Sequence, residues 1–148
     1  MRVNYNRIQK DMINSLSKGN RIIVKTVADK TYIIDGTSCY VLPKERNFLQ
    51  EQGEIDLNFF LNMQHDVVVG VPNVNLYKKV NGKNCIRLFD AEDFERPIYI
   101  LKNSIKNIDL NKMILSTTEN RDLVFFEDED TEELVGYTIT VGRKIRKR

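Results

Sequence analysis

Residues 75–89 read NLYKKVNGKNCIRLF, and the dipeptide Asn81-Gly82 divides them into two runs of β-forming residues. A tight two-residue turn needs positive φ at its central positions, which Asn and Gly adopt at low cost. The stretch therefore predicts a β-hairpin with strands at Asn75–Val80 and Cys85–Phe89. A hairpin of this kind indicates an antiparallel sheet.

The segments before this hairpin predict a helix followed by an antiparallel meander. Residues 5–17 carry apolar side chains at spacings of three and four, and Gly19 follows where a helix would end. Three β-like runs come next, at Arg21–Val27, Thr31–Ile34 and Ser38–Leu42, with Asp35-Gly36 as a second hairpin signal. A short buried helix is expected within Ile55–Met63.

The rest of the chain predicts five more strands and little helix. The expected strands are Val67–Val71, Ile98–Lys102, Lys112–Thr117, Asp122–Glu127 and Glu133–Val141, with a charged link at Asp90–Arg96 and a weak helical pattern at Asn103–Asn111. No long crossover helix separates successive strands, which argues against parallel βαβ units. We therefore expect one α+β domain over residues 1–142, with antiparallel sheets and two or three short helices, followed by a basic tail at 143–148.

The strand pattern also predicts which side chains are buried, because large apolar residues in a strand need a covered face. The residues expected in the core are Ile22, Val24, Ile33, Val68, Ile100, Phe125 and Ile139. The aromatic residues are spread over all predicted elements, which is typical of a core and not of a stacking surface.

The composition of the chain indicates the cellular compartment in which the protein is expected. The chain is 41% hydrophobic and 30% charged, and none of its apolar runs approaches the 18 residues of a membrane span. The N-terminal residues show no secretory signal, so we expect a cytoplasmic protein without membrane contact. Cys39 and Cys85 are far apart and predict buried thiols in a reducing compartment. The 15 Asn, 15 Ile and 13 Lys fit an AT-rich genome, so a low-GC bacterium or its phage is a hypothesis for the source.

Catalytic and cofactor motifs do not emerge from the sequence. His65 is the only histidine, beside Asp66 between a predicted helix and a predicted strand, where a solvated or capping role is expected. The chain has no Gly-x-Gly-x-x-Gly, no P-loop and no Gly-x-Ser-x-Gly. We therefore expect no catalytic residues, no metal, no cofactor and no enzymatic activity.

Two charged segments are the candidate sites. The acidic segment consists of Glu127, Asp128, Glu129, Asp130, Glu132 and Glu133. Its carboxylates favour a solvated hairpin loop, with an acidic docking or cation patch as the alternative. An EF-hand starting at Asp128 is excluded because Glu133 and Ile139 occupy the positions of the required Gly and Glu.

The C-terminal tail carries the positive charge. Five of its six residues are basic, namely Arg143, Lys144, Arg146, Lys147 and Arg148. Clustered Lys and Arg bind phosphate backbones by releasing counterions. The tail therefore indicates either a solubilising end or a weak nucleic-acid contact.

The C-terminal sequence resembles a known family. Residues 122–126, an acidic turn and residues 133–141 look like the final hairpin of bacterial sliding-clamp domains, which also resemble this chain in their element order. That family usually ends with a Tyr, a Met-Pro pair and a basic residue, whereas this chain has Thr140-Val141-Gly142-Arg143 without the proline. The resemblance implies DNA encirclement only if several such domains close a ring, hence a homo-oligomer, and it implies no catalytic residues.

Three classes of function remain open. The first is a non-enzymatic binding module for nucleic acid or for a protein of the replication or mobile-element machinery. The second is a phage structural or assembly protein. The third is an enzyme whose scattered carboxylates, Lys and Tyr form no recognisable motif.

Overall fold

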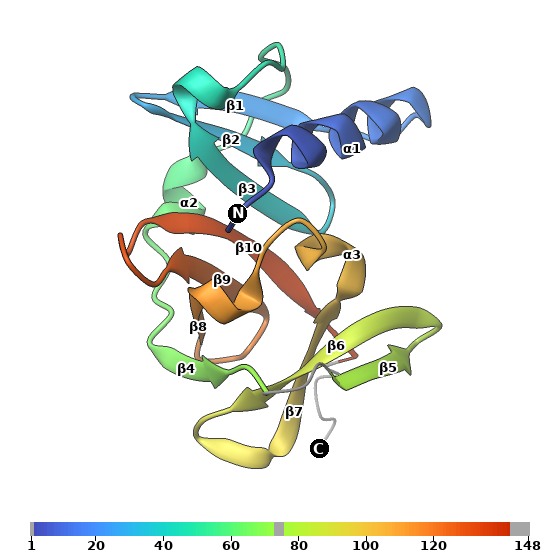
Figure 1. The fold of residues 1–148 in the computed structure, drawn as a ribbon, viewed down its shortest axis with the longest axis vertical. Helices are drawn as coiled ribbons and strands as arrows, with labels where there is room; N and C mark the ends of the chain where they lie inside the picture. The colour runs from blue at the N-terminus through green and yellow to red at the C-terminus, as the bar shows by residue number, and fades with distance from the viewer. Residues whose placement is uncertain (1, 73–75, 143–148) are drawn as a thin grey trace.

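The computed structural model describes residues 2–72 and 76–142 (Figure 1). The helices are α1 (Tyr5–Ser17), α2 (Leu57–Leu61) and α3 (Lys102–Ile105), with single 3-10 turns η1 (Lys44–Arg46) and η2 (Leu110–Lys112). The strands are β1 (Ile23–Val27), β2 (Lys30–Ile34), β3 (Ser38–Pro43), β4 (Val67–Gly70), β5 (Leu76–Val80), β6 (Lys83–Asp90), β7 (Asp93–Leu101), β8 (Met113–Thr117), β9 (Leu123–Asp128) and β10 (Leu134–Val141). The predicted α+β class with antiparallel sheet is confirmed.

Helix α1 has the bounds that its periodicity predicts. The side chain of Asn4 caps it by accepting a hydrogen bond from the backbone N–H of Arg7 at 3.1 Å. Its buried side chains are Ile8, Gln9 and Met12, and the helix lies across the β1–β3 meander (Figure 1).

Among the described residues, no helix has the length and apolarity that a membrane span requires.

Strand β10 joins the two parts of the sheet because it is paired on both edges. One edge pairs with β9 over Leu134–Ile139, while the other edge pairs first with β3 and then, at Thr140 and Val141, with β7. From β7 the pairing continues through β6, β4 and β8 to β9, always antiparallel. Six strands therefore close into a ring, and β1–β3 extend the sheet from β10.

The two faces of the sheet bury two separate hydrophobic clusters. The larger one fills the interior of the ring and continues beneath α1, with Ile33, Ile98, Ile100, Val124 and Phe126 among its members. The smaller one covers the outer face of β3, β9 and β10 beneath α2, where Phe60 stacks on Tyr137 at 5.2 Å between ring centroids. This division explains why β9 is buried on both faces.

Five of the seven residues predicted to be buried are buried, and two are not. Ile22, Val24, Ile33, Ile100 and Phe125 are at most 4% exposed. Val68 is 61% exposed, because its neighbours Val67 and Val69 take the buried positions of β4. Ile139 is 36% exposed, because it lies on the outer face of β10 beyond the cluster around Tyr137. The alternation of side chains assigns the residues of a strand to two faces, but it does not show which face packs against the core.

The predicted charged link Asp90–Arg96 is wrong. Strand β6 continues to Asp90 and β7 already begins at Asp93, so the connection is a tight turn with an irregular register beside it. Residues 93–96 are exposed, and their polar side chains therefore cost nothing in a strand. The charged residues Asp93, Glu95 and Arg96 therefore lie in a strand and not in a loop.

Candidate nucleic-acid interface

The predicted tail residues, Arg143, Lys144, Arg146, Lys147 and Arg148, lie outside the described residues. The described chain ends at Gly142, whose φ is 78°. A Cβ at Gly142 would lie 2.4 Å from a methyl carbon of Val80, the last residue of β5. The sequence therefore continues into its basic tail from a point beside the β5–β6 hairpin.

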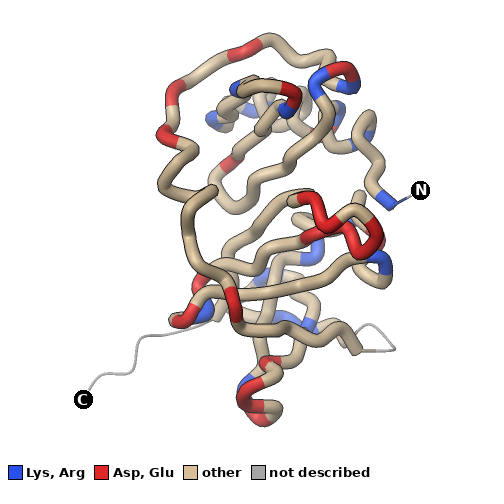
Figure 2. The backbone as a smooth tube through the Cα atoms, turned by 90° about the vertical axis from the view of Figure 1, so that its left-hand side faces the viewer, with Lys and Arg blue, Asp and Glu red and all other residues tan. Residues whose placement is uncertain are grey.

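The acidic segment forms the turn between β9 and β10, beside the N-terminal end of the chain (Figure 2). Within it, the backbone N–H groups of Asp130 and Thr131 donate to Asp128 Oδ1, and the first of these bonds is the main cause that lowers the pKa of the Asp128 carboxyl. Arg2 forms ion pairs with Asp128 and Asp130. Basic side chains of the same chain thus partly neutralise this segment.

Lys30 adds one more ion pair, since its Nζ lies 3.1 Å from a carboxylate oxygen of Glu133. Glu127, Glu129, Asp130 and Glu132 surround the same turn. In the part of the chain that the structure describes, no group of three or more His, Cys, Asp or Glu side chains is arranged to hold a metal ion.

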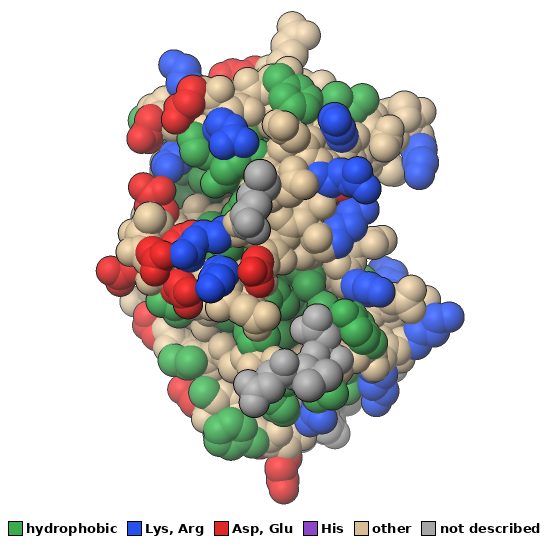
Figure 3. Space-filling view, in the orientation of Figure 1, with side chains coloured by type: hydrophobic (Ala, Val, Ile, Leu, Met, Phe, Trp, Pro, Cys, Tyr) green, Lys and Arg blue, Asp and Glu red, His purple; other side chains and the backbone are tan. Residues whose placement is uncertain are grey.

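A basic surface that sequence reasoning missed lies on the β5–β6 hairpin and α3. Its members are Lys78, Lys79, Lys83, Arg87 and Lys102. In Figure 3, blue side chains gather along the right-hand side of the molecule, where Figure 1 places the β5–β6 hairpin. Residues 76–89 and 97–108 contain six Lys or Arg and no Asp or Glu, so all 21 acidic residues lie elsewhere. The sixth, Lys106, is paired with Asp11 at 3.5 Å and is left out of this surface.

The hairpin that presents these lysines folds as its turn residues predict. Asn81 and Gly82 have φ values of 52° and 78°, and Val80 pairs with Lys83 across the turn. Strand β5 is exposed along Leu76–Lys79 and pairs only with β6 among the described strands. Lysines on an edge strand oppose pairing with another chain, which is their ordinary structural role.

Aromatic rings lie next to basic side chains on both faces of the β5–β6 hairpin, because Tyr77 and Lys79 share one face while Lys78 and Arg87 share the other with Tyr99. Lys102 Nζ lies 4.7 Å from the ring centroid of Tyr77, and Lys78 Nζ lies 5.6 Å from that of Tyr99. The Arg87 guanidinium lies 5.5 Å from the centroid of Phe89. Such cation–π contacts fix the positions of long side chains without neutralising their charge.

The surface is hollowed between β5 and α3. A groove of about 300 Å³ is lined by Tyr77, Lys78, Lys79, Asn84, Cys85 and Lys102. On the neighbouring strand, Arg87 Nε is buried and has no hydrogen-bond partner within the described chain. The groove itself is lined by the ammonium groups of three lysines and by no carboxylate, which suits a phosphate-bearing ligand.

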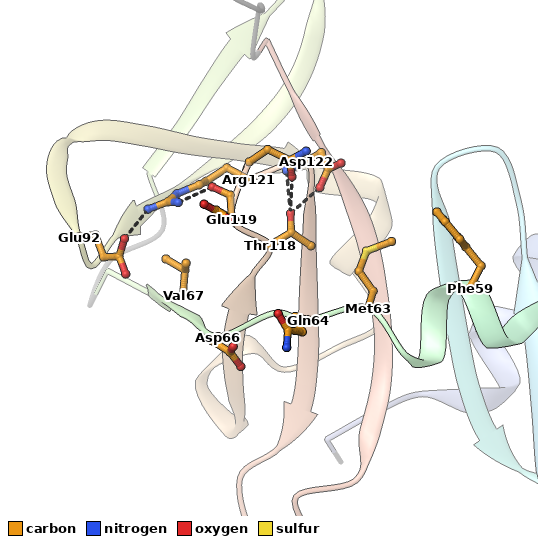
Figure 4. A pocket seen from close by; sticks show the side chains of 11 residues that line it. Phe59, Met63, Gln64, Asp66, Val67, Glu92, Thr118, Glu119, Arg121 and Asp122 are labelled. Atoms are coloured by element: carbon orange, nitrogen blue, oxygen red, sulfur yellow. Dashed lines mark hydrogen bonds and ion pairs between the residues drawn. The ribbon is translucent and has the colours of Figure 1, made fainter.

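A second and larger cleft, of about 880 Å³, has the opposite chemistry (Figure 4). Its lining includes the carboxylates Asp66, Glu92, Glu119 and Asp122, and its one cationic side chain among the described residues is Arg121. Arg121 is engaged, since its Nε lies 2.8 Å from Asp90 Oδ2 and its Nη2 lies 2.9 Å from Glu92 Oε1. The hydrogen bond with Asp90 is the main cause that raises the pKa of Arg121. This cleft does not suit a polyanion.

His65 and the cysteines are part of the packing. His65 stacks on Phe125 at 4.0 Å between centroids, and its Nδ1 lies 2.7 Å from Ser116 Oγ, a partner 51 residues away that no local pattern indicates. No carboxylate is hydrogen-bonded to His65 in the described part of the chain. Cys39 and Cys85 are buried free thiols, as predicted, and burial raises the pKa of Cys39 to about 12.

The chain was compared with protein-family models, curated proteins and solved structures. No protein-family model, curated protein or solved structure matches the chain. The resemblance to sliding-clamp domains stays a prediction.

Proposed function

We propose that this chain is a non-enzymatic nucleic-acid-binding module that contacts phosphates through its basic surface. The observation that carries the proposal is the concentration of Lys78, Lys79, Lys83, Arg87 and Lys102 in two segments, 76–89 and 97–108, that contain no Asp or Glu. The sequence alone motivates nucleic-acid binding through the tail. The hairpin supplies a second, independent reason.

The geometry supports phosphate contacts more than contacts with a protein carboxylate. Four ammonium groups and one guanidinium spread over β5, β6 and α3, which matches the repeated charges of a phosphate backbone. The groove between β5 and α3 offers ammonium donors, and the amide of Asn84 adds a neutral polar group. Contacts of this kind position a nucleic acid and carry little base preference.

The tail adds to the same surface in this proposal. Gly142 lies against Val80, so the described part of the chain ends beside the hairpin. The sequence that follows Gly142 carries five further basic residues, which would add phosphate contacts to those of the hairpin. Tail and hairpin then act together, and removal of either should weaken binding.

The test is a salt-dependent binding titration with a labelled duplex DNA. The double variant Lys78→Gln/Lys79→Gln and deletion of residues 143–148 should each weaken binding at low salt. Each should also flatten the plot of log affinity against log salt by about 0.9 per lost phosphate contact. The matched control is Lys44→Gln/Lys112→Gln, which removes the same charge from two exposed lysines of η1 and η2.

The proposal predicts that the control behaves like the wild type. If the control weakens binding as much as the hairpin variant, net charge alone explains the affinity and the basic surface has no special role. If the wild-type protein binds no nucleic acid at low ionic strength, the proposed function is wrong.

A further inference from the structure

Tyr77 differs from the other aromatic residues of the basic surface by its exposure. It is 57% exposed, whereas Tyr99 and Phe89 are half-buried. It lies on β5, at the edge of the sheet, and it lines the groove together with Lys79 and Lys102. A large aromatic ring at this place leaves apolar area in water inside an otherwise cationic rim.

The contacts of Tyr77 fix its position. Lys102 Nζ lies 4.7 Å from its ring centroid, so an ammonium group is held next to the ring. Lys79 is two residues further along the same strand and therefore points to the same side of the sheet. Asn84, the cross-strand partner of Lys79, is also exposed there.

This arrangement combines one ring with two ammonium groups at short range. Aromatic side chains that stack on bases, next to cations that bind the flanking phosphates, are the means by which proteins bind unpaired strands. In a duplex the faces of the bases are stacked on each other and are not available for stacking on a side chain, although their edges are exposed in the grooves. Phosphate contacts alone would need the lysines but no exposed ring.

We infer, on the basis of the proposed function, that the ligand of the basic surface is single-stranded nucleic acid and that one base stacks on Tyr77. Lys79 and Lys102 bind the phosphates on either side of that base. Tyr99 and Phe89, beneath Lys78 and Arg87, hold those cations in position and take no base. The specificity for the single strand thus depends on one side chain, whereas the general affinity depends on the lysines.

The experiment compares three labelled probes, a 12-nucleotide oligothymidylate, a 12-nucleotide oligouridylate and a 12-base-pair DNA duplex. The variants are Tyr77→Ala and Tyr77→Phe. The control is Phe94→Ala, which removes an aromatic ring that is 69% exposed but lies between Asp93 and Glu95. Circular dichroism confirms that each variant is folded.

Tyr77→Ala should weaken binding to the single-stranded probes by about 5- to 100-fold, the usual loss for one base–aromatic stack. Tyr77→Phe should bind like the wild type, because a phenyl ring stacks as well. Duplex affinity should stay within about twofold in all variants. The two single-stranded probes distinguish DNA from RNA as the source of the strand.

A spectroscopic readout follows from the composition. The chain has six Tyr and no Trp, so tyrosine emission can be measured directly. Stacking of a base on Tyr77 should quench part of this emission, and the quenching should be absent in Tyr77→Phe although that variant still binds. A side chain that only stabilises the hairpin would not produce this difference.

The inference is wrong if Tyr77→Ala binds the single strands like the wild type, or if it loses duplex and single-strand affinity equally. The proposed function survives either result as long as Lys78→Gln/Lys79→Gln still weakens binding. If no probe binds the wild-type protein at low salt, the proposed function itself fails. The two failures are therefore distinguishable.

Discussion

Replacement of Gly136 by alanine tests the pairing of β10 with β3, on which the whole architecture depends. Gly136 pairs with Tyr40 in β3 and with Phe126 in β9. A Cβ on Gly136 would lie 2.3 Å from the carbonyl oxygen of Cys39, and 3.4 Å from the Cα of Tyr40. The obstructing atoms belong to backbone, so no rotamer change can make room.

We expect Gly136→Ala to lower the free energy of unfolding by about 3 kcal/mol, at the upper end of the usual cost of overpacking. For a chain of this size, that loss corresponds to a fall of about 6–12 °C in the midpoint of thermal unfolding. Urea titration followed by circular dichroism gives the free energy, and a temperature scan gives the midpoint.

The matched control is Gly36→Ala. A Cβ on Gly36 meets no atom within 4 Å, and Gly36 is not among the residues with positive φ. Alanine there should change stability little or raise it by up to about 1 kcal/mol, because it restricts the unfolded chain. If Gly136→Ala and Gly36→Ala unfold at the same midpoint, the close approach of β10 to β3 is not a feature of the protein.

Two further predictions concern buried polar groups. Arg121→Met should lower the free energy of unfolding by about 3 kcal/mol, because the carboxylate of Asp90, whose side chain is 1% exposed, would lose the guanidinium that neutralises it. The double variant Arg121→Met/Asp90→Asn should recover part of this loss in the same urea titration. The second prediction is alkaline destabilisation. Burial raises the pKa of Cys39 from 9.0 to about 12, so above pH 9 the unfolded state binds fewer protons than the folded state, and stability should fall between pH 9 and about 12. The urea midpoint of the wild type should decrease over that pH range. The urea midpoint of Cys39→Ala, relative to its own value at pH 8, should decrease less.

The hairpin at residues 75–89 illustrates what local sequence determines. The positive φ values of Asn81 and Gly82 come from the residues themselves, and they set the turn without help from distant contacts. The same holds for α1, whose apolar spacing and Asn4 cap are local. Most strand positions were also predicted from runs of β-forming residues, with the first residues of β7 as the exception.

Contacts between distant residues decided what the sequence left open. Val68 and Ile139 lie in correctly predicted strands, yet the covered face depends on which strands pair and on where α2 packs. The pairing of β10 with β3 joins residues up to 100 positions apart, and its pairing with β7, which closes the ring, joins residues 40 and 42 positions apart. Local patterns do not encode such partners.

The candidate site shows the same division. The absence of Asp and Glu from residues 76–89 and 97–108 is visible in the sequence and is the signal that points to the basic surface. Only the folded chain brings Lys102 of α3 over the ring of Tyr77 in β5, because the intervening β6–β7 hairpin returns the chain to the same side of the sheet. By itself the sequence determined the elements and the distribution of charge along the chain; the tertiary structure determined which charges and rings share a surface, since that depends on pairing between strands far apart in sequence.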